Sequence, residues 1–220
     1  MRPPGGSRGG PPRRCPADHR VLEEAPEAPA DLTVGFEEGR PVRLDGVRLD
    51  PVAQVTRLNE LAGMHGVGRV GVVESSLLGI KTRAVYESPG GTVLHAAHRE
   101  LEALCLDRHT LRLEAGLDQR YAELVYDGMW YSSLRSSLDT FVAATQGAVT
   151  GTVGLRLHKG SVLVTGREAA RGLYPPSLSD HGDGDVFDHR AAAAFAYIWS
   201  MPRRVSRLAS SPPPRPAGGH

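Results

Sequence analysis

The sequence lacks the features that mark several common protein classes. It has two cysteines, Cys15 and Cys105, and no CxxC pair, so a disulfide framework is excluded. It has no run of 18 apolar residues that could cross a membrane. Its first residues also lack the apolar segment of a signal peptide. These absences predict a cytoplasmic protein with reduced thiols and no membrane partner.

A strong charge of one sign is also absent. The 220 residues carry 26 basic and 25 acidic side chains, a formal net charge of +1. The balance is uneven, because residues 21–199 hold 17 basic and 24 acidic side chains, while both ends are rich in arginine. A nucleic-acid-binding domain instead gathers basic charge on one folded face. We therefore expect no nucleic-acid partner.

Glycine and proline are concentrated near the two ends of the chain and divide it into three parts. Residues 1–20 have no apolar periodicity, which predicts a disordered segment. Residues 21–200 alternate apolar and polar patterns and are predicted to fold as one domain. Residues 201–220 predict a Pro/Arg-rich tail that follows the last helix.

The folded part shows both strand and helix patterns. Period-two alternation predicts strands over 32–36 and 42–44, joined at Glu38-Gly39, and a hairpin over 153–164 around Lys159-Gly160. Two further strands are expected over 69–74 and up to residue 86. Apolar spacing of three to four predicts helices over 51–61, 94–104, 134–142 and 189–199, the first capped by Asp50. Another helix after residue 107 is expected to be interrupted near Gly116, and Pro89-Gly90-Gly91 to form a break. This mixture predicts an α+β fold.

Three side chains could be metal ligands, but the sequence does not supply a full set of ligands. His95, His98 and Glu102 fall on one face of the predicted helix over 94–104, where they could act as ligands. No further strong ligand is evident in the sequence, and histidines on the surface of an amphipathic helix are common. We therefore expect no metal, and we interpret these residues as part of a polar helix face.

Other short motifs also fail their chemical requirements. Gly79 to Thr82 resembles the end of a phosphate-binding loop but lacks the glycine before Lys81. Four aspartates form an acidic loop without the spacing of a calcium-binding loop: Asp180, Asp183, Asp185 and Asp188. We interpret that loop as solvated, and Cys105 as a buried apolar residue.

Several blocks of sequence, all in the same order, resemble argininosuccinate synthases. They are HGVGRVGVVESSLLGIKTRAVYESPGGTVLHAAHRELEALCLDR, RYAELVYDGMWYS, VTGTVGLRLHKGSVLVTGRE and DVFDHRAAAAFAYIW. The likeness covers about residues 21–200 and corresponds to the C-terminal half of the family's chain.

The resemblance implies an ATP-dependent C–N ligase of arginine biosynthesis. Family members join citrulline and aspartate using ATP with magnesium, and release AMP and pyrophosphate. Their N-terminal half is an ATP-pyrophosphatase domain, and their C-terminal half is the synthetase and oligomerisation domain of a homotetramer. We therefore expect a fragment without the ATP site. Such a chain would have no catalytic or cofactor-binding residues of its own and would be inactive alone.

The resemblance also implies two citrulline ligands in this half. They correspond to Glu74, within VVESS, and Tyr86, within RAVYE. A carboxylate can pair with the α-ammonium group of an amino acid, and a phenol adds a directional hydrogen bond. Ser75 and Ser76 stand where the family has Asn-Arg. The alternative interpretation is a non-catalytic module that self-associates or assembles with a full-length synthase.

Overall fold

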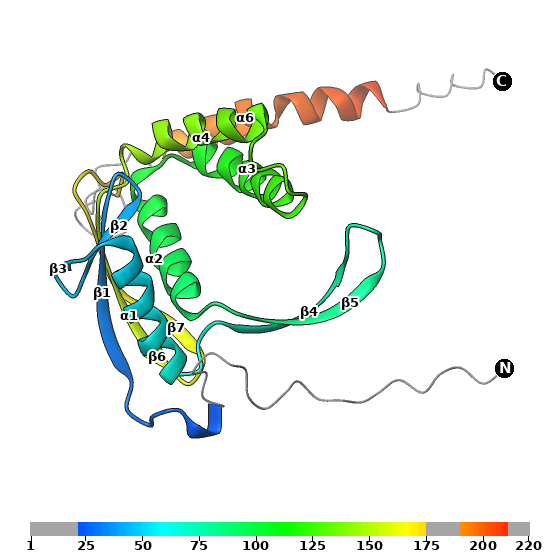
Figure 1. Ribbon diagram of the computed structural model, residues 1–220. Helices are drawn as coiled ribbons and strands as arrows, with labels where there is room; N and C mark the ends of the chain where they lie inside the picture. Colours follow the sequence, from blue (N-terminus) through cyan, green and yellow to red (C-terminus); the bar gives the residue numbers. More distant parts are fainter. Residues whose placement is uncertain (1–21, 175–189, 211–220) are drawn as a thin grey trace, which may run out of the picture. The chain divides into compact units, whose positions relative to one another are not determined.

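The computed structural model describes residues 22–174 and 190–210. The chain divides into two compact units at Leu173–Tyr174. The first unit contains an antiparallel sheet of five strands in the order β3-β2-β1-β6-β7 (Figure 1). The strands are β1 (Ala30–Glu37), β2 (Arg40–Leu44), β3 (Val47–Arg48), β6 (Gly151–His158) and β7 (Ser161–Ala169), and a short 3-10 helix, Leu22–Glu24, precedes them. Strands and helices in this arrangement confirm the α+β prediction.

Tight turns set the register of this sheet. Glu38-Gly39, Asp45-Gly46 and Lys159-Gly160 each have positive φ at both positions, with values between 42° and 84°. Two such residues form the turn whose twist matches a right-handed hairpin. The turns join Glu37 to Arg40, Leu44 to Val47 and His158 to Ser161. The hairpins expected at the first and third turns are confirmed.

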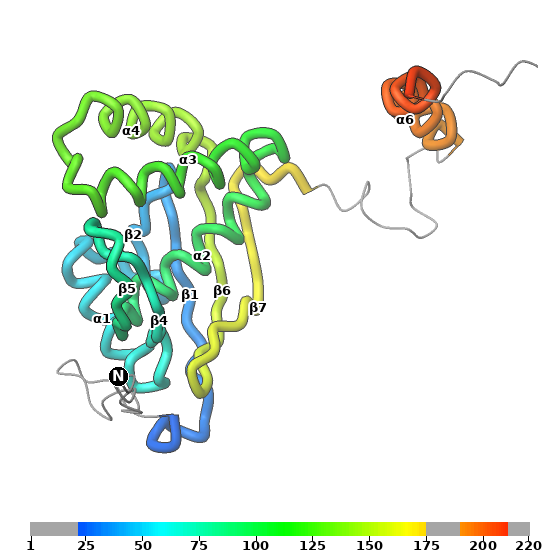
Figure 2. Tube along the Cα trace, turned by 90° about the vertical axis from the view of Figure 1, so that its right-hand side faces the viewer, coloured from blue at the N-terminus to red at the C-terminus, as the bar shows by residue number. Residues whose placement is uncertain are grey.

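One face of the sheet is covered by two helices. Helix α1 (Pro51–Met64) and helix α2 (Pro89–Cys105) pack against each other, and α2 lies along β1, β6 and β7 (Figures 1 and 2). Alternate residues of the strands point into this layer and are buried: Leu32, Val34, Phe36, Val153, Leu155 and Leu157. Leu58 of α1 and Val93, Ala97 and Leu101 of α2 belong to the same core. Burial of these side chains is the main force that holds the layers together.

The predicted break at Pro89-Gly90-Gly91 is wrong, because these residues form the first turn of α2. Proline is favourable at the first position of a helix, because an N–H group there would have no hydrogen-bond partner within the helix. Gly90 lies directly against α1: its N–H donates to Asn59 Oδ1 at 2.8 Å, and an added Cβ would lie 3.2 Å from Leu58 Cβ. The glycine therefore permits close packing of the two helices.

Two further helices, α3 (Arg108–Tyr126) and α4 (Ser133–Gln146), pack against each other. Asp107 caps α3 by accepting from the N–H groups of His109 and Thr110. The expected interruption of α3 near Gly116 is wrong, since the helix runs through this residue without a break. One glycine costs a helix only about 1 kcal/mol relative to alanine. The remaining residues and the packing outweigh that cost.

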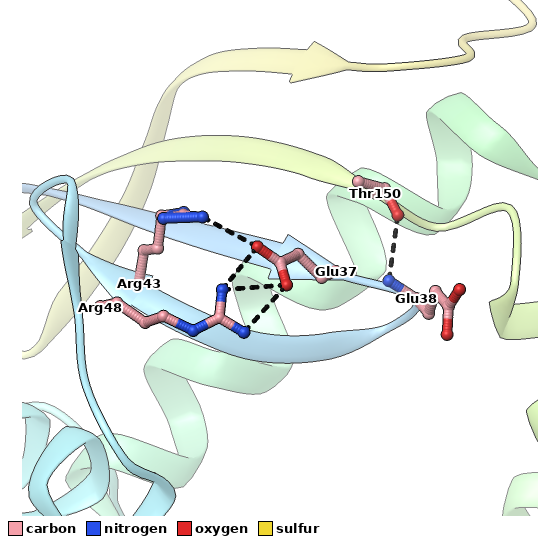
Figure 3. Close-up of polar contacts among 5 residues, drawn as sticks. All are labelled: Glu37, Glu38, Arg43, Arg48 and Thr150. Atoms are coloured by element: carbon pink, nitrogen blue, oxygen red, sulfur yellow. Dashed lines mark hydrogen bonds and ion pairs between the residues drawn. The ribbon is translucent and has the colours of Figure 1, made fainter.

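The polar face of the sheet carries charged pairs. Glu37 of β1 accepts hydrogen bonds from Arg43 and Arg48 at 2.9 Å, and these contacts link all three strands at this edge of the sheet (Figure 3). Asp31 and Arg156 form a two-bond pair between β1 and β6 at 2.7 and 2.8 Å. The arginines lower the pKa of both carboxyl groups below the usual range, mainly through the hydrogen bond from Arg156 to Asp31 and that from Arg48 to Glu37.

The second unit contains helix α6 (Arg190–Ala209). The helix expected to end at Trp199 instead continues through Pro202 to Ala209. Proline removes one backbone hydrogen bond from a helix interior, and the residues on both sides of Pro202 remain helical. None of the described helices is long and apolar enough to cross a membrane.

Candidate functional site

The predicted substrate residues lie on a two-stranded hairpin that extends from the sheet and helices of the first unit (Figure 1). Strands β4 (Arg69–Ser75) and β5 (Lys81–Glu87) pair with each other and with none of the other described strands. We call this hairpin, residues 69–87, the arm. Residues 76–80 form its tip, closed by the hydrogen bond from Ser76 N–H to the Ile80 carbonyl at 2.9 Å.

The arm brings Glu74 and Tyr86 together. In the β4–β5 register Glu74 lies opposite Thr82, and Tyr86 lies opposite Val70. Residues four apart on a strand point to the same side, so both side chains share one face of the arm. The Tyr86 hydroxyl donates to Glu74 Oε1 at 2.5 Å. The two residues named from the family resemblance therefore form one polar pair.

The electrostatics of this pair favour a neutral phenol. The hydrogen bond to Glu74 raises the pKa of Tyr86 above its ordinary value, and partial desolvation and the Glu74 charge add to the effect. Tyr86 stays 48% exposed, and Glu74 has a second carboxylate oxygen outside this bond. The pair can thus offer a carboxylate oxygen and a phenolic hydroxyl to a ligand at the surface.

The base of the arm is fixed on its opposite face. Arg69 Nε lies 3.0 Å from Glu87 Oε1, and the Glu87 side chain is only 6% exposed. One residue, Ser88, separates Glu87 from helix α2, whose first residue is Pro89. This ion pair closes the hairpin where it meets the packed helices.

A contact near the tip was not foreseen from the sequence. Tyr126, the last residue of α3, donates its hydroxyl to the Ser75 carbonyl at 3.3 Å. The Tyr126 phenol also contributes to the raised pKa of Tyr86. No local pattern joins these positions, since they are 51 residues apart in the chain.

Comparison with known proteins shows to which family the chain belongs. A family model described as the arginosuccinate synthase C-terminal domain matches residues 11–206. An argininosuccinate synthase from Synechococcus sp. (strain JA-2-3B'a(2-13)) is 49% identical over 195 residues, 89% of this chain and 49% of its own length. The protein of the same name from Rubrobacter xylanophilus is 49% identical over 182 residues, 83% of this chain and 44% of its own length.

The chain belongs to the argininosuccinate synthase family. It spans about half the length of the curated relatives it matches. The family is one of ligases, which agrees with the resemblance seen in the sequence. The boundaries expected at residues 20 and 201 stay predictions.

The three side chains considered as metal ligands, His95, His98 and Glu102, do not gather at one point in this argininosuccinate synthase domain. His95 is exposed, whereas His98 contacts Gln146 Oε1 at 2.9 Å and lies 3.5 Å from Glu102. Gln146 in turn donates to Glu102 at 2.7 Å, and desolvation raises the pKa of Glu102. Among residues 22–174 and 190–210, no group of three or more His, Cys, Asp or Glu side chains could hold a metal.

The structure also places two of the three other motifs considered from the sequence. Gly79 lies in the arm tip and Lys81 begins β5, so this segment leads into a strand where a phosphate-binding loop leads into a helix. The interpretation of Cys105 as a buried residue is confirmed, and burial raises the pKa of its thiol. The aspartate loop lies within 175–189, outside the described residues.

Proposed function

We propose that this chain supplies part of the citrulline site of an argininosuccinate synthase. The proposed reaction joins citrulline and aspartate, consumes ATP with magnesium, and yields argininosuccinate, AMP and pyrophosphate. The observation that carries the proposal is the Glu74–Tyr86 pair on one face of the arm. The family membership supports the same assignment.

The chemistry of the pair suits the amino-acid end of citrulline. An ammonium group can donate to the free oxygen of Glu74, and the Tyr86 hydroxyl can turn from Glu74 toward a ligand atom. A charge-assisted hydrogen bond is about twice as strong as a neutral one, so Glu74 would contribute more binding energy than Tyr86. Two groups on one strand pair form only one side of a pocket. A small zwitterion needs several convergent polar groups.

The ATP half of the reaction requires a different structure. Adenylation depends on backbone N–H groups that cradle phosphates and on a metal bound to them. No segment within 22–174 or 190–210 offers this combination, and we propose that a separate ATP-pyrophosphatase domain binds ATP and magnesium. The 220-residue chain alone is then inactive. Citrulline-dependent ATP turnover by the purified chain would contradict this.

The substrate assignment is tested by supplying the missing half. The N-terminal half of the Synechococcus relative is added in trans or by fusion, and citrulline kinetics are measured at saturating ATP and aspartate. Glu74→Gln should weaken citrulline binding by about 1.5–3 kcal/mol, the range for a hydrogen bond to a charged group. Tyr86→Phe should cost about 0.5–1.5 kcal/mol, because its donor is neutral.

The matched control is Glu168→Gln, which changes an exposed glutamate on β7. It removes the same charge but leaves the arm intact, so the citrulline KM should not change. If Glu74→Gln gives the same citrulline KM and kcat as this control, the assignment of Glu74 is wrong. A change in melting temperature alone would assign Glu74 a structural role.

A second candidate function is a non-catalytic assembly module, favoured by exposed apolar side chains on the described residues. Leu77, Leu78 and Ile80 at the arm tip are 61–85% exposed. Under this proposal the chain joins copies of itself, or a full-length cytoplasmic synthase tetramer, without forming product. Upstream DNA that encodes an open frame with the Ser-Gly-Gly-x-Asp loop would favour the enzyme over the module.

A further inference from the structure

The Ser75 carbonyl lies at the free edge of the arm, on the side away from β5. Ser76 N–H donates to the Ile80 carbonyl and Ser88 N–H donates to the Gly68 carbonyl, so hydrogen-bonded positions lie just beyond both ends of the β4–β5 ladder. Hydrogen-bonded and non-bonded pairs alternate along such a ladder. The preceding pair, Ser75 and Lys81, is therefore non-bonded, and the Ser75 carbonyl points away from β5. This is the carbonyl that accepts from Tyr126.

The donor comes from a rigid part of the molecule. After Tyr126, helix α3 ends with Asp127 and Gly128, and Gly128 has φ of 72°. Met129 N–H donates to the Leu124 carbonyl at 2.8 Å, and Gly128 N–H donates to the Val125 carbonyl at 3.2 Å. These two bonds form the Schellman motif that closes a helix end. With Leu124 only 4% exposed, the backbone that carries Tyr126 is held by packing and by hydrogen bonds.

The arm itself has little to fix it between its two ends. A two-stranded hairpin alone is marginally stable in water, since it has no third strand and no covered face. Several of its apolar side chains are more than half exposed: Val70, Val73, Leu77, Leu78 and Ile80. Arg69 and Glu87 hold its base, and the Tyr126 hydroxyl reaches β4 at the opposite end, one residue beyond Glu74.

We propose that Tyr126 is a positioning residue: its hydroxyl ties the arm to helix α3 and so fixes the orientation of the arm, and with it the Glu74–Tyr86 pair, for binding the ammonium group of an amino acid. The citrulline part of this inference rests on the proposed function. The tether itself does not, because it concerns the mobility of the arm. Without the hydroxyl, the arm samples more orientations, and a ligand must order it on binding.

The tether is tested first on the 220-residue chain by amide hydrogen exchange. Tyr126→Phe removes only the hydroxyl and keeps the ring. Amides of β4 and β5 near the tip should exchange several-fold faster than in the unchanged chain, because local opening becomes easier. Two controls lose a hydroxyl elsewhere. Tyr131→Phe changes a residue that is 96% exposed, and Tyr121→Phe removes a bond to Asp139 on α4. Neither should alter exchange in the arm.

Substrate kinetics then test the positioning role in the enzyme completed with the N-terminal half of the Synechococcus relative. Tyr126→Phe should raise the citrulline KM about 2- to 12-fold, the equivalent of one neutral hydrogen bond. It should leave the KM for ATP unchanged, and neither control should alter either value. Unchanged arm exchange in Tyr126→Phe overturns the tether.

The two proposals fail in distinguishable ways. Faster arm exchange with an unchanged citrulline KM, while Glu74→Gln raises that KM, overturns the positioning role but keeps the citrulline site. If Glu74→Gln also has no effect on citrulline, the proposed function is wrong, and faster arm exchange still supports the tether. An equal rise in the KM for citrulline and for ATP overturns the positioning role, because it indicates general disturbance.

Discussion

At the scale of single residues, the buried side chain of His65 makes the stability of the chain depend on pH. It caps the C-terminus of α1, is only 5% exposed, and its Nδ1 atom has no hydrogen-bond partner among the described residues. Desolvation lowers the pKa of His65 below 6.5, and the nearby His158 lowers it further. The unfolded chain therefore binds this proton more readily than the folded chain. Stability from His65 is present above about pH 6.5 and is lost as pH falls through the lower folded pKa.

The lowered pKa of His65 predicts how the free energy of unfolding changes at acid pH. The free energy of unfolding, measured by urea denaturation from pH 7.5 to 5, should fall with decreasing pH, and His65→Gln should flatten the slope. His95→Gln, at an exposed position on α2, should leave the slope unchanged. The pKa values of Glu27, Asp31 and Glu37 are lowered in the folded chain. The stability that these carboxylates contribute is therefore lost mainly below about pH 4.5. Equal slopes in the two variants would contradict the role of His65.

Residue chemistry also limits how much of the site can be predicted. Glu74 and Tyr86 could be named because whole sequence blocks resembled a family, and strand alternation then places both on one face. Tyr126 could not be found this way. Its partner is a backbone carbonyl, which carries no sequence signal, and its distance from Ser75 in the chain hides the contact. Only the end of α3, closed at Gly128, brings the hydroxyl to the arm.

At the scale of elements, local signals predicted the strands and turns well. Glycine at the second turn position predicts the Glu38-Gly39 and Lys159-Gly160 hairpins, and Asp45-Gly46 has the same pattern. The predictions are wrong where glycine or proline is expected to end or interrupt a helix. Pro89, Gly116 and Pro202 all lie within helices. Packing or helix length outweighs the local preference at these positions.

Gly116 therefore offers a simple test of helix propensity. It lies on the exposed side of α3, and an added Cβ would meet nothing within 4 Å. Gly116→Ala should raise the free energy of unfolding by about 0.5–1 kcal/mol, since alanine loses less backbone entropy in a helix. Denaturant unfolding measures the change. The contrasting variant is Gly128→Ala at the end of the same helix, which should destabilise the chain because Gly128 has a positive φ.

At the scale of the whole molecule, the sequence predicted the α+β class but not the arm. Hydrophobic periodicity shows which face of a strand is buried, and it does not show whether a hairpin joins the main sheet. Val70 and Val73 are apolar like core residues, yet they are 52% and 71% exposed. Apolar side chains on an exposed hairpin are typical of a surface that meets another domain or chain. The arm thus agrees with a chain that spans about half of its relatives' length.

Helix α6 leads to a prediction about self-association of the chain. Phe195, Ile198, Trp199 and Val205 lie on one side of this helix and are 58–69% exposed, and the rings of Phe195 and Trp199 stack at 5.5 Å. Contiguous apolar surface of this kind favours association between copies. We expect light scattering at micromolar concentration to give a mass above the 23.6 kDa of one chain. Ile198→Asp should shift the population toward monomer by placing a charge on the apolar side.

Ser200 lies on the opposite side of α6 and provides the matched variant. Ser200→Asp adds the same charge to the same helix but leaves the apolar side unchanged, so the association constant should stay within about twofold of the unchanged chain, as is usual for surface substitutions. Circular dichroism of both variants checks that helix content is equal. A monodisperse monomer of the unchanged chain, or equal loss of association in both variants, would show that the apolar side of α6 does not drive assembly.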